Sequence, residues 1–498
     1  MFHRTSNRRW NVSPWGLGAV FGRESAVRDP PLTRASSREV GPRPAPLDAA
    51  PHGHPRRGCA VNVRTPGGLL ATSEVDDAPK RYLRSAWAPA AVVTVWFAWA
   101  YFHVRPSGHV SAAHAWATYG TSAFGHLAYS DVISLYYAFH LANHALVYVH
   151  TPVEYPVLTG LFMWLAAWVP GVQGYFLAST LGLCACAVGT TYILHRIEWR
   201  LAWPFALCPL LFVYGLLNWD LLAIFLMVAG WAQFRAHRYG WAGTLLSLAV
   251  WAKFFPVIVL FYCVVSLVGD GSSRRSARKM ILTATVTAVL VNLPFAVANV
   301  GNWSHFYVFN ARRRGSGGVL NELHLSSALS VSTIDLLSAL LVLGAVGWLT
   351  PRVLRGVSPV VAAAATFAVL FLVGKVYSPQ YMLWLFVLAI IAQWPAWTLV
   401  LMSVAGVVDY ASSMTILYLS HTCSPAFGWF FRTIYPWNSA LRNTTFALGL
   451  GWAALRGPAV ATGGARGEVS PPPSELNGGR RAVASTVDAV EKGGPPPN

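Results

Sequence analysis

The chain has 498 residues, of which 55% are hydrophobic and 11% are charged, and its mean hydropathy is +0.45. Soluble globular domains carry about 25% charged residues, so this composition excludes a soluble protein with a charged outer surface. In a soluble protein the net charge of +18 would indicate a nucleic-acid ligand. In membrane proteins the same excess of Lys and Arg marks cytoplasmic loops, and no nucleic-acid partner is expected.

Three regions follow from composition. Residues 1–79 are rich in Arg, Pro, Ser and Gly and lack hydrophobic periodicity, so they are predicted to be a disordered cytoplasmic extension. Residues 457–498 have a similar composition and are predicted to be a disordered cytoplasmic tail. Residues 80–456 are predicted to form one membrane domain.

Apolar runs of about 20 residues are long enough to span a bilayer. Such runs occur at 86–103, 174–194, 279–298 and 325–349. Clusters of Lys and Arg, beginning at Lys80, mark cytoplasmic ends, and successive clusters must be joined by an even number of crossings. The pattern predicts an all-α polytopic membrane protein with about 12 transmembrane helices and both termini in the cytoplasm.

The even-number rule has two local consequences. The run 156–169 is short for a span and begins with proline, so we expect a juxtamembrane helix in a large first outer loop that starts at Arg105. The run 241–268 must leave the cytoplasm and return to it. It is therefore predicted to be two short helices with residues 253–256 at the outer turn.

This topology places polar side chains on one face of the membrane. Three of the eight acidic residues between 80 and 456 belong to this set. Alternatively, Glu154 pairs with Lys253 to hold helices together, and Asp220 only caps a helix. The set comprises Asp131, Glu154, Tyr155, Asn218, Asp220, Lys253, Lys375, Tyr377 and Gln380.

Three consecutive arginines, Arg312, Arg313 and Arg314, lie in the predicted outer loop 299–324. Their position opposes the positive-inside bias. Arginine binds phosphate oxygens through paired donors, and the glycines that follow would let backbone N–H groups approach the same anion. The cluster therefore predicts a phosphate site at the outer leaflet, supplemented by Lys253 and Lys375. Contact with anionic lipid head groups is the alternative.

Asp131 is the only acidic residue between Arg105 and Val153. It precedes Tyr136, Tyr137, Phe139 and Leu141, which resemble an interfacial amphipathic helix. A carboxylate held at the membrane surface is suited to removing a proton from an acceptor hydroxyl. A solvated loop carboxylate is the alternative.

No metal site is predicted. Histidines at positions 114, 126, 140, 144 and 150 fall in the first outer loop, but no pair has convincing ligand spacing. The six cysteines lie mostly in apolar runs and are interpreted as small packing residues.

Five motifs, in this order, carry a resemblance: YSD at 129–131, VEYPVLTG at 153–160, NWDLLA at 218–223, KFFP at 253–256 and KVYSPQY at 375–381. The series resembles actinobacterial members of glycosyltransferase family 87, which are polyprenol-phosphate-mannose-dependent mannosyltransferases of the GT-C superfamily. The resemblance implies a multi-helix membrane fold, inversion at the sugar and a catalytic acidic residue in the first outer loop, which Asp131 matches. Lys253 matches a lysine of the family pattern.

Two motifs depart from that pattern. Members often have Tyr-Pro-Pro and Gly-Gln-x-Asn where this chain has YPV at 155–157 and LNWD at 217–220. The chain thus resembles a divergent subgroup, and the departure bears on the donor sugar more than on the lipid-phosphate donor.

The leading hypothesis is a glycosyltransferase that moves a sugar, expected to be mannose, from a polyprenyl phosphate to a hydroxyl of a glycolipid, glycan or protein. Transfer would occur at the outer face of the plasma membrane, among membrane lipids and without a cofactor. Asp131 would be the base, and the basic residues would stabilise the departing phosphate. The alternatives are a transporter or flippase of a lipid-linked glycan intermediate, which charges at mid-membrane depth would favour, and a scaffold without an enclosed cavity.

Overall fold

A computed structural model describes residues 85–105, 115–269, 273–313, 319 and 329–455. The predictions of disorder in 1–79 and 457–498 lie outside these residues, as does the predicted role of Arg314. Within the described part of the chain the regular elements are helices, and an isolated β-bridge joins Val147 to Thr151.

The helices of the first half of the chain are α2 (Trp87–Val104), α3 (Ala115–Gly125), α4 (Asp131–Ala138), the 3₁₀ turn η2 (Leu141–Asn143), α5 (Val157–Ala166), α6 (Gly171–Ile197), α7 (Trp199–Ala206), α8 (Leu210–Tyr214), α9 (Asp220–Arg235) and α10 (Tyr239–Ala252). Those of the second half are α11 (Val257–Gly269), α12 (Arg274–Ala298), α13 (Val300–Arg312), α16 (Val331–Leu354), α17 (Pro359–Val373), α18 (Tyr381–Ile391), α19 (Ala396–His421), α20 (Ala426–Thr433) and α21 (Tyr435–Leu455).

Five of these helices are long and apolar enough to cross a membrane: α2, α6, α12, α16 and α19. Each of the four apolar runs predicted to span overlaps one of the first four. Shorter apolar helices, α5, α11, α17 and α18, lie between them. The all-helical membrane fold is thus confirmed, whereas the count of about 12 crossings stays a prediction.

Proline explains the break between α10 and α11. In a continuous helix the carbonyl of Ala252 would accept a hydrogen bond from the residue four positions later, but that residue is Pro256, which has no N–H. The backbone of Lys253 is extended, with φ −153° and ψ 133°. The hydroxyl of Thr159 on α5 donates to the Ala252 carbonyl instead, at 2.6 Å. The predicted split of residues 241–268 into two helices is therefore present.

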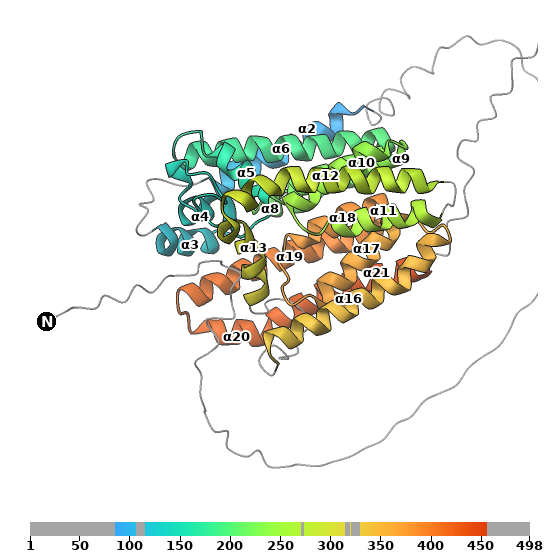
Figure 1. Ribbon diagram of the computed structural model, residues 1–498. Coiled ribbons are helices and arrows are strands. Elements are labelled where there is room, and N and C mark those ends of the chain that lie inside the picture. The colour runs from blue at the N-terminus through green and yellow to red at the C-terminus, as the bar shows by residue number, and fades with distance from the viewer. Residues whose placement is uncertain (1–84, 106–114, 270–272, 314–318, 320–328, 456–498) are drawn as a thin grey trace, which may run out of the picture. The chain divides into compact units, whose positions relative to one another are not determined.

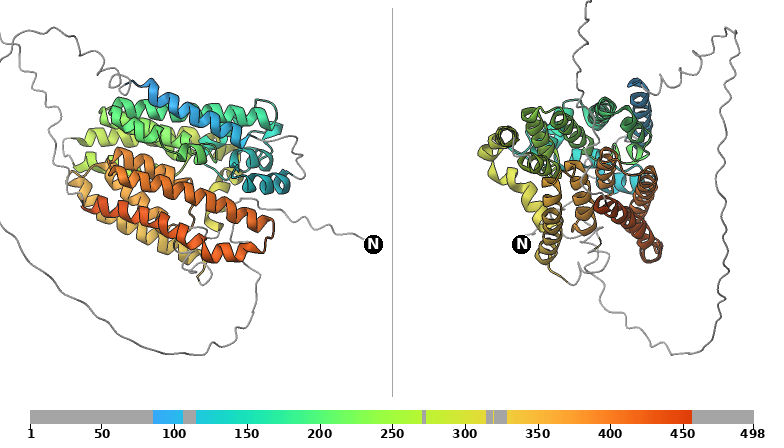
Figure 2. Two further views of the ribbon diagram at one scale, coloured as in Figure 1. Left: turned by 180° about the vertical axis from the view of Figure 1, so that it is seen from behind. Right: turned by 90° about the vertical axis from the view of Figure 1, so that its right-hand side faces the viewer.

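The long helices run side by side, and the short helices α3, α4, α13 and α20 gather at one end of the bundle (Figure 1). Views from behind and along the helices show the same bundle, with the green helices of the first half and the orange helices of the second half on opposite sides (Figure 2). Apolar side chains point outward along α12 and α16, for example Leu290 at 69% and Leu343 at 63% exposure. Such a surface suits contact with lipid.

Two local predictions were wrong. Tyr136, Phe139 and Leu141 do not form an interfacial helix, because all three are buried in the core. Residues 299–312 were predicted to be a loop, but Asn299 caps a helix: its side chain accepts a hydrogen bond from the backbone N–H of Asn302, and α13 follows. Both segments were misassigned because aromatic residues occur both at the membrane surface and between packed helices.

Candidate functional site

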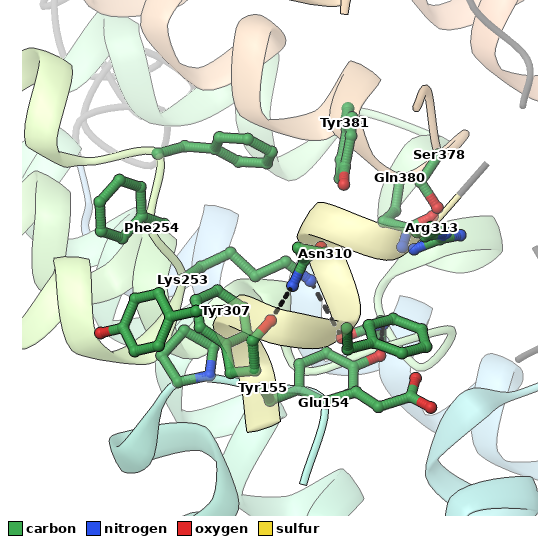
Figure 3. Close-up of a pocket in the computed structure, with 15 residues that line it drawn as sticks. Glu154, Tyr155, Lys253, Phe254, Tyr307, Asn310, Arg313, Ser378, Gln380 and Tyr381 are labelled. Atoms are coloured by element: carbon green, nitrogen blue, oxygen red, sulfur yellow. Dashed lines mark hydrogen bonds between the residues drawn. The ribbon is translucent and has the colours of Figure 1, made fainter. Parts of the chain in front are cut away.

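A cavity of about 370 Å³ opens near the end of the bundle where the short helices gather (Figure 3). Its walls come from five places: the segment before α5, the segment before α9, the turn between α10 and α11, helix α13 with the residue after it, and the start of α18 with the segment before it. Its lining residues are Glu154, Tyr155, Pro156, Asn218, Lys253, Phe254, Phe255, Phe306, Tyr307, Phe309, Asn310, Arg313, Ser378, Gln380 and Tyr381. Six of the twelve predicted site residues are among them.

Lys253 sits in this wall because the helix break turns its backbone outward from α10. Its Nζ atom lies 3.1 Å from Oδ1 of Asp220, a carboxylate that is 1% exposed. The same oxygen accepts a hydrogen bond from the indole N–H of Trp384 at 2.8 Å. The Lys253 ammonium also lies 5.1 Å from the centre of the Tyr155 ring. The alternative pairing of Lys253 with Glu154 was therefore wrong, and Asp220 is the counter-ion of this lysine.

Asn218 connects the cavity to Asp131. The Asn218 side-chain amide donates to Oδ2 of Asp131 at 2.9 Å and to the Tyr155 hydroxyl at 2.7 Å. The Tyr129 hydroxyl donates to Oδ1 of Asp131 at 2.8 Å. Ser130 caps α4 by accepting from the N–H of Val132, which fixes the backbone at Asp131. The Asp131 carboxylate is only 2% exposed and lies behind the lining residue Asn218.

Arg313 follows the end of α13 and lies beside Gln380 and Ser378 (Figure 3). Its Nε and Nη2 atoms are buried and have no hydrogen-bond partner among the described residues, and the same holds for Oε1 of Gln380. Leaving a buried donor unpaired costs about 1–3 kcal/mol, and more when the group is charged. A guanidinium in this condition, at the wall of a cavity, is suited to an anionic ligand.

Glu154 precedes α5 and is the one carboxylate among the lining residues. It makes no ion pair with the described residues. Burial raises the pKa of Glu154 to about 7; the nearby Arg313 guanidinium opposes the shift and the Asp131 carboxylate adds to it. The carboxyl group thus exchanges a proton near neutral pH.

Five predicted residues among those described do not line the cavity. Lys375 forms an ion pair with Asp335 at 2.9 Å and donates to the Ala311 carbonyl at 3.3 Å. Tyr377 is buried, with its ring 4.2 Å from the guanidinium carbon of Arg442. Arg312 is exposed on the last turn of α13. Asp131 and Asp220 contact lining residues without lining the cavity, so the structure brings most of the predicted set together.

Two features escaped sequence reasoning. Helix α13 contributes lining residues, and the spacing of Trp303, Phe306, Tyr307 and Asn310 at helical intervals could have indicated it. The second feature is a buried ion pair within the bundle.

This second feature joins two helices. Nη1 of Arg442 on α21 lies 3.2 Å from Oδ1 of Asp409 on α19, and the amide of Asn438 donates to the same oxygen at 2.9 Å. Both charged side chains are at most 1% exposed, and neither lines the cavity. Because each charge faces its counter-ion in a closed environment, the pair marks no route across the molecule.

The structure thus combines a multi-helix membrane fold with a charged and aromatic cavity. Residues 154–379 match the model of glycosyltransferase family 87. This match confirms the predicted resemblance, and the protein is a glycosyltransferase. No curated protein and no solved structure matches the chain at a significant level. The matched region begins at Glu154 and includes Lys253 and Arg313, whereas Asp131 precedes it.

Proposed function

We propose that the protein transfers a mannosyl group from a polyprenyl phosphate to an acceptor hydroxyl at the outer face of the plasma membrane. The observation that carries this proposal is the Arg313 guanidinium in the wall of a cavity rich in aromatic side chains: its Nε and Nη2 atoms are buried without a hydrogen-bond partner among the described residues. A phosphodiester attached to an apolar chain would match both features, the cationic guanidinium and the aromatic walls. An anion would pair with Arg313, and isoprene units would contact Phe254, Phe255 and Tyr307.

In this reaction Asp131 is the general base. The acceptor O–H bond breaks, its proton moves to Asp131, and the oxygen forms a bond to the anomeric carbon as the bond from that carbon to the phosphate oxygen breaks. Attack from the face opposite the phosphate inverts the sugar. Tyr129 and Asn218 each donate a hydrogen bond to Asp131 and so hold its orientation. The acceptor would approach from the side of Asn218 and Tyr155.

Negative charge grows on the leaving phosphate, and Arg313 is placed to stabilise it. Lys253, which lines the same cavity, adds positive charge near the phosphate, although Asp220 already offsets part of that charge. No cofactor enters the proposal. The acceptor belongs to the hydroxyl-bearing lipids, glycans or proteins of the cell envelope.

A transporter or flippase of a lipid-linked intermediate is not favoured. The family match is to a glycosyltransferase, and the charges found within a spanning helix, at Asp409, are paired and enclosed. These observations support catalysis at the cavity.

The test uses the purified full-length protein in liposomes with a set of radiolabelled polyprenyl-phosphate sugars and a mixed envelope acceptor fraction. We expect label to move to the acceptor from polyprenyl-phosphate mannose, and none to move from a nucleotide sugar. Failure with every polyprenyl-phosphate sugar, by protein that is monodisperse, would overturn the proposal. Movement of intact donor between leaflets without transfer would instead support the flippase.

A further inference from the structure

The carboxyl groups around the cavity differ in the hydrogen-bond donors that contact them. Asp220 accepts from the Lys253 ammonium and the Trp384 indole, and Asp131 accepts from the Tyr129 hydroxyl and the Asn218 amide. Such donors stabilise a carboxylate anion. Glu154 lines the cavity without a hydrogen-bond donor among the described residues. When environments push the pKa values of two carboxyl groups apart in this way, the group whose anion is less stabilised is suited to carry a proton.

Glu154 also lies at the end of the cavity where Arg313 stands (Figure 3). A phosphate bound to Arg313 would therefore lie close to the Glu154 carboxyl group. We propose that Glu154 is a second catalytic residue, which donates its proton to the phosphate oxygen that leaves the sugar. This inference rests on the proposed transfer from a polyprenyl phosphate and assigns a role that the general base cannot fill.

The charges that face Glu154 support this role. Burial is the largest cause of its raised pKa of about 7; Arg313, directly after α13, lowers the pKa, and Asp131, at the start of α4, raises it further. The Tyr155 hydroxyl interacts electrostatically with Glu154, and Lys253 lies across the Tyr155 ring. A bound phosphate would offset the positive charge of Arg313. The pKa of Glu154 would then rise further, so the group would be protonated at neutral pH when donor is bound.

The step balances. The acceptor proton goes to Asp131, and the new bond joins the acceptor oxygen to the anomeric carbon. The electron pair of the broken carbon–oxygen bond stays on the phosphate oxygen, which takes the proton of Glu154. The products are the glycoside and a singly protonated polyprenyl phosphate, with Asp131 neutral and Glu154 anionic. Asp131 then loses one proton to solvent and Glu154 regains one. The second pKa of a phosphate monoester is about 6, so this proton transfer is close to balanced.

The test is the pH dependence of kcat at saturating donor, for the wild type and for Glu154→Gln. A general acid works only when protonated, so wild-type kcat should fall as the pH rises through the pKa of Glu154, at or above about 7. In Glu154→Gln this alkaline decline should disappear, and kcat at pH 6 should drop about 100-fold, the lower end for general acid catalysis, because Arg313 still stabilises the leaving group. The KM for donor should stay nearly unchanged.

Glu198→Gln is the matched control, because Glu198 lies between α6 and α7 and does not line the cavity. It should leave both kcat and the alkaline decline intact. Glu154→Asp provides a second test in case the Glu154→Gln variant does not fold. It should keep the decline but move it to lower pH, since aspartate has the lower ordinary pKa.

An alkaline decline that persists unchanged in Glu154→Gln, or in Glu154→Asp where Gln does not fold, overturns the inference. A raised donor KM with an unchanged decline also overturns it, because Glu154 would then only bind substrate. Neither result touches the proposed function, which fails separately if the wild type transfers no sugar from any polyprenyl phosphate.

Discussion

Arg442 is fully buried and Arg313 has two buried guanidinium nitrogens, but only Arg442 forms an ion pair with a carboxylate of the described residues. Asp409 lies 3.2 Å from Arg442, whereas Arg313 has buried nitrogens without a hydrogen-bond partner there. The first arginine joins α19 to α21, and the second lies in the wall of a cavity. The comparison teaches that a buried charge paired within the chain serves the fold, whereas an unpaired one at a cavity is suited to a ligand.

The largest effect is expected for Asp131→Asn. Loss of a general base lowers kcat by about 100- to 10,000-fold. The amide nearly preserves the shape of the side chain, so the thermal unfolding temperature should change little. Transfer from the lipid-linked donor, measured beside Asp335→Asn as a control on an exposed carboxylate, checks this. Full activity in Asp131→Asn would remove Asp131 from the reaction.

Arg442→Leu should affect stability instead. Removing one partner of a buried ion pair costs about 3–5 kcal/mol, and replacing both partners with apolar residues is close to neutral. Thermal unfolding in detergent should therefore show a strongly destabilised single variant and recovery in Asp409→Leu/Arg442→Leu. The folded fraction should keep its donor KM. If the double variant were as unstable as the single one, the ion pair would stabilise the fold by more than neutralising its two charges.

Arg313→Gln is expected to raise the KM for donor. Hydrogen bonds to a charged group are worth about 1.5–3 kcal/mol, which corresponds to about a 10- to 100-fold change in KM. Stability should change little, because Nε and Nη2 of Arg313 make no hydrogen bond with the described residues. Arg312→Gln is the matched control, since Arg312 is exposed on the neighbouring turn. Equal effects of the two variants would place the phosphate elsewhere.

The smallest effect is expected for Lys375→Gln. Lys375, whose side chain is 11% exposed, pairs with Asp335, whose side chain is 42% exposed and therefore open to screening by water. Exposed ion pairs contribute about 0–1 kcal/mol, so activity and the unfolding temperature should stay close to those of the wild type. A loss of transfer comparable to that of Arg313→Gln would show that Lys375 leaves Asp335 to bind the donor.

Sequence reasoning succeeded where the signal is local. Apolar runs identified spanning helices, because a run depends on residues that are neighbours in the chain. The even number of crossings between Lys and Arg clusters identified the break between α10 and α11. The pairing of Lys253 with Asp220 was missed, since it joins residues on different helices. The burial of Asp131 was missed for the same reason: its partner Asn218 lies far along the chain. The Asp409–Arg442 pair also depends on which helices pack together.

The hydroxyl of Thr159 that replaces the missing proline N–H has a mechanical consequence. It fastens α5, and with it the segment that carries Glu154, to the turn that carries Lys253. This hydrogen bond thus links two walls of the cavity directly. Helix α13 has no buried residue, and its first turn is held to the Val149 carbonyl by the side chains of Asn299 and Asn302. A bulky substrate would thus gain room by displacing α13, the wall that also positions Arg313.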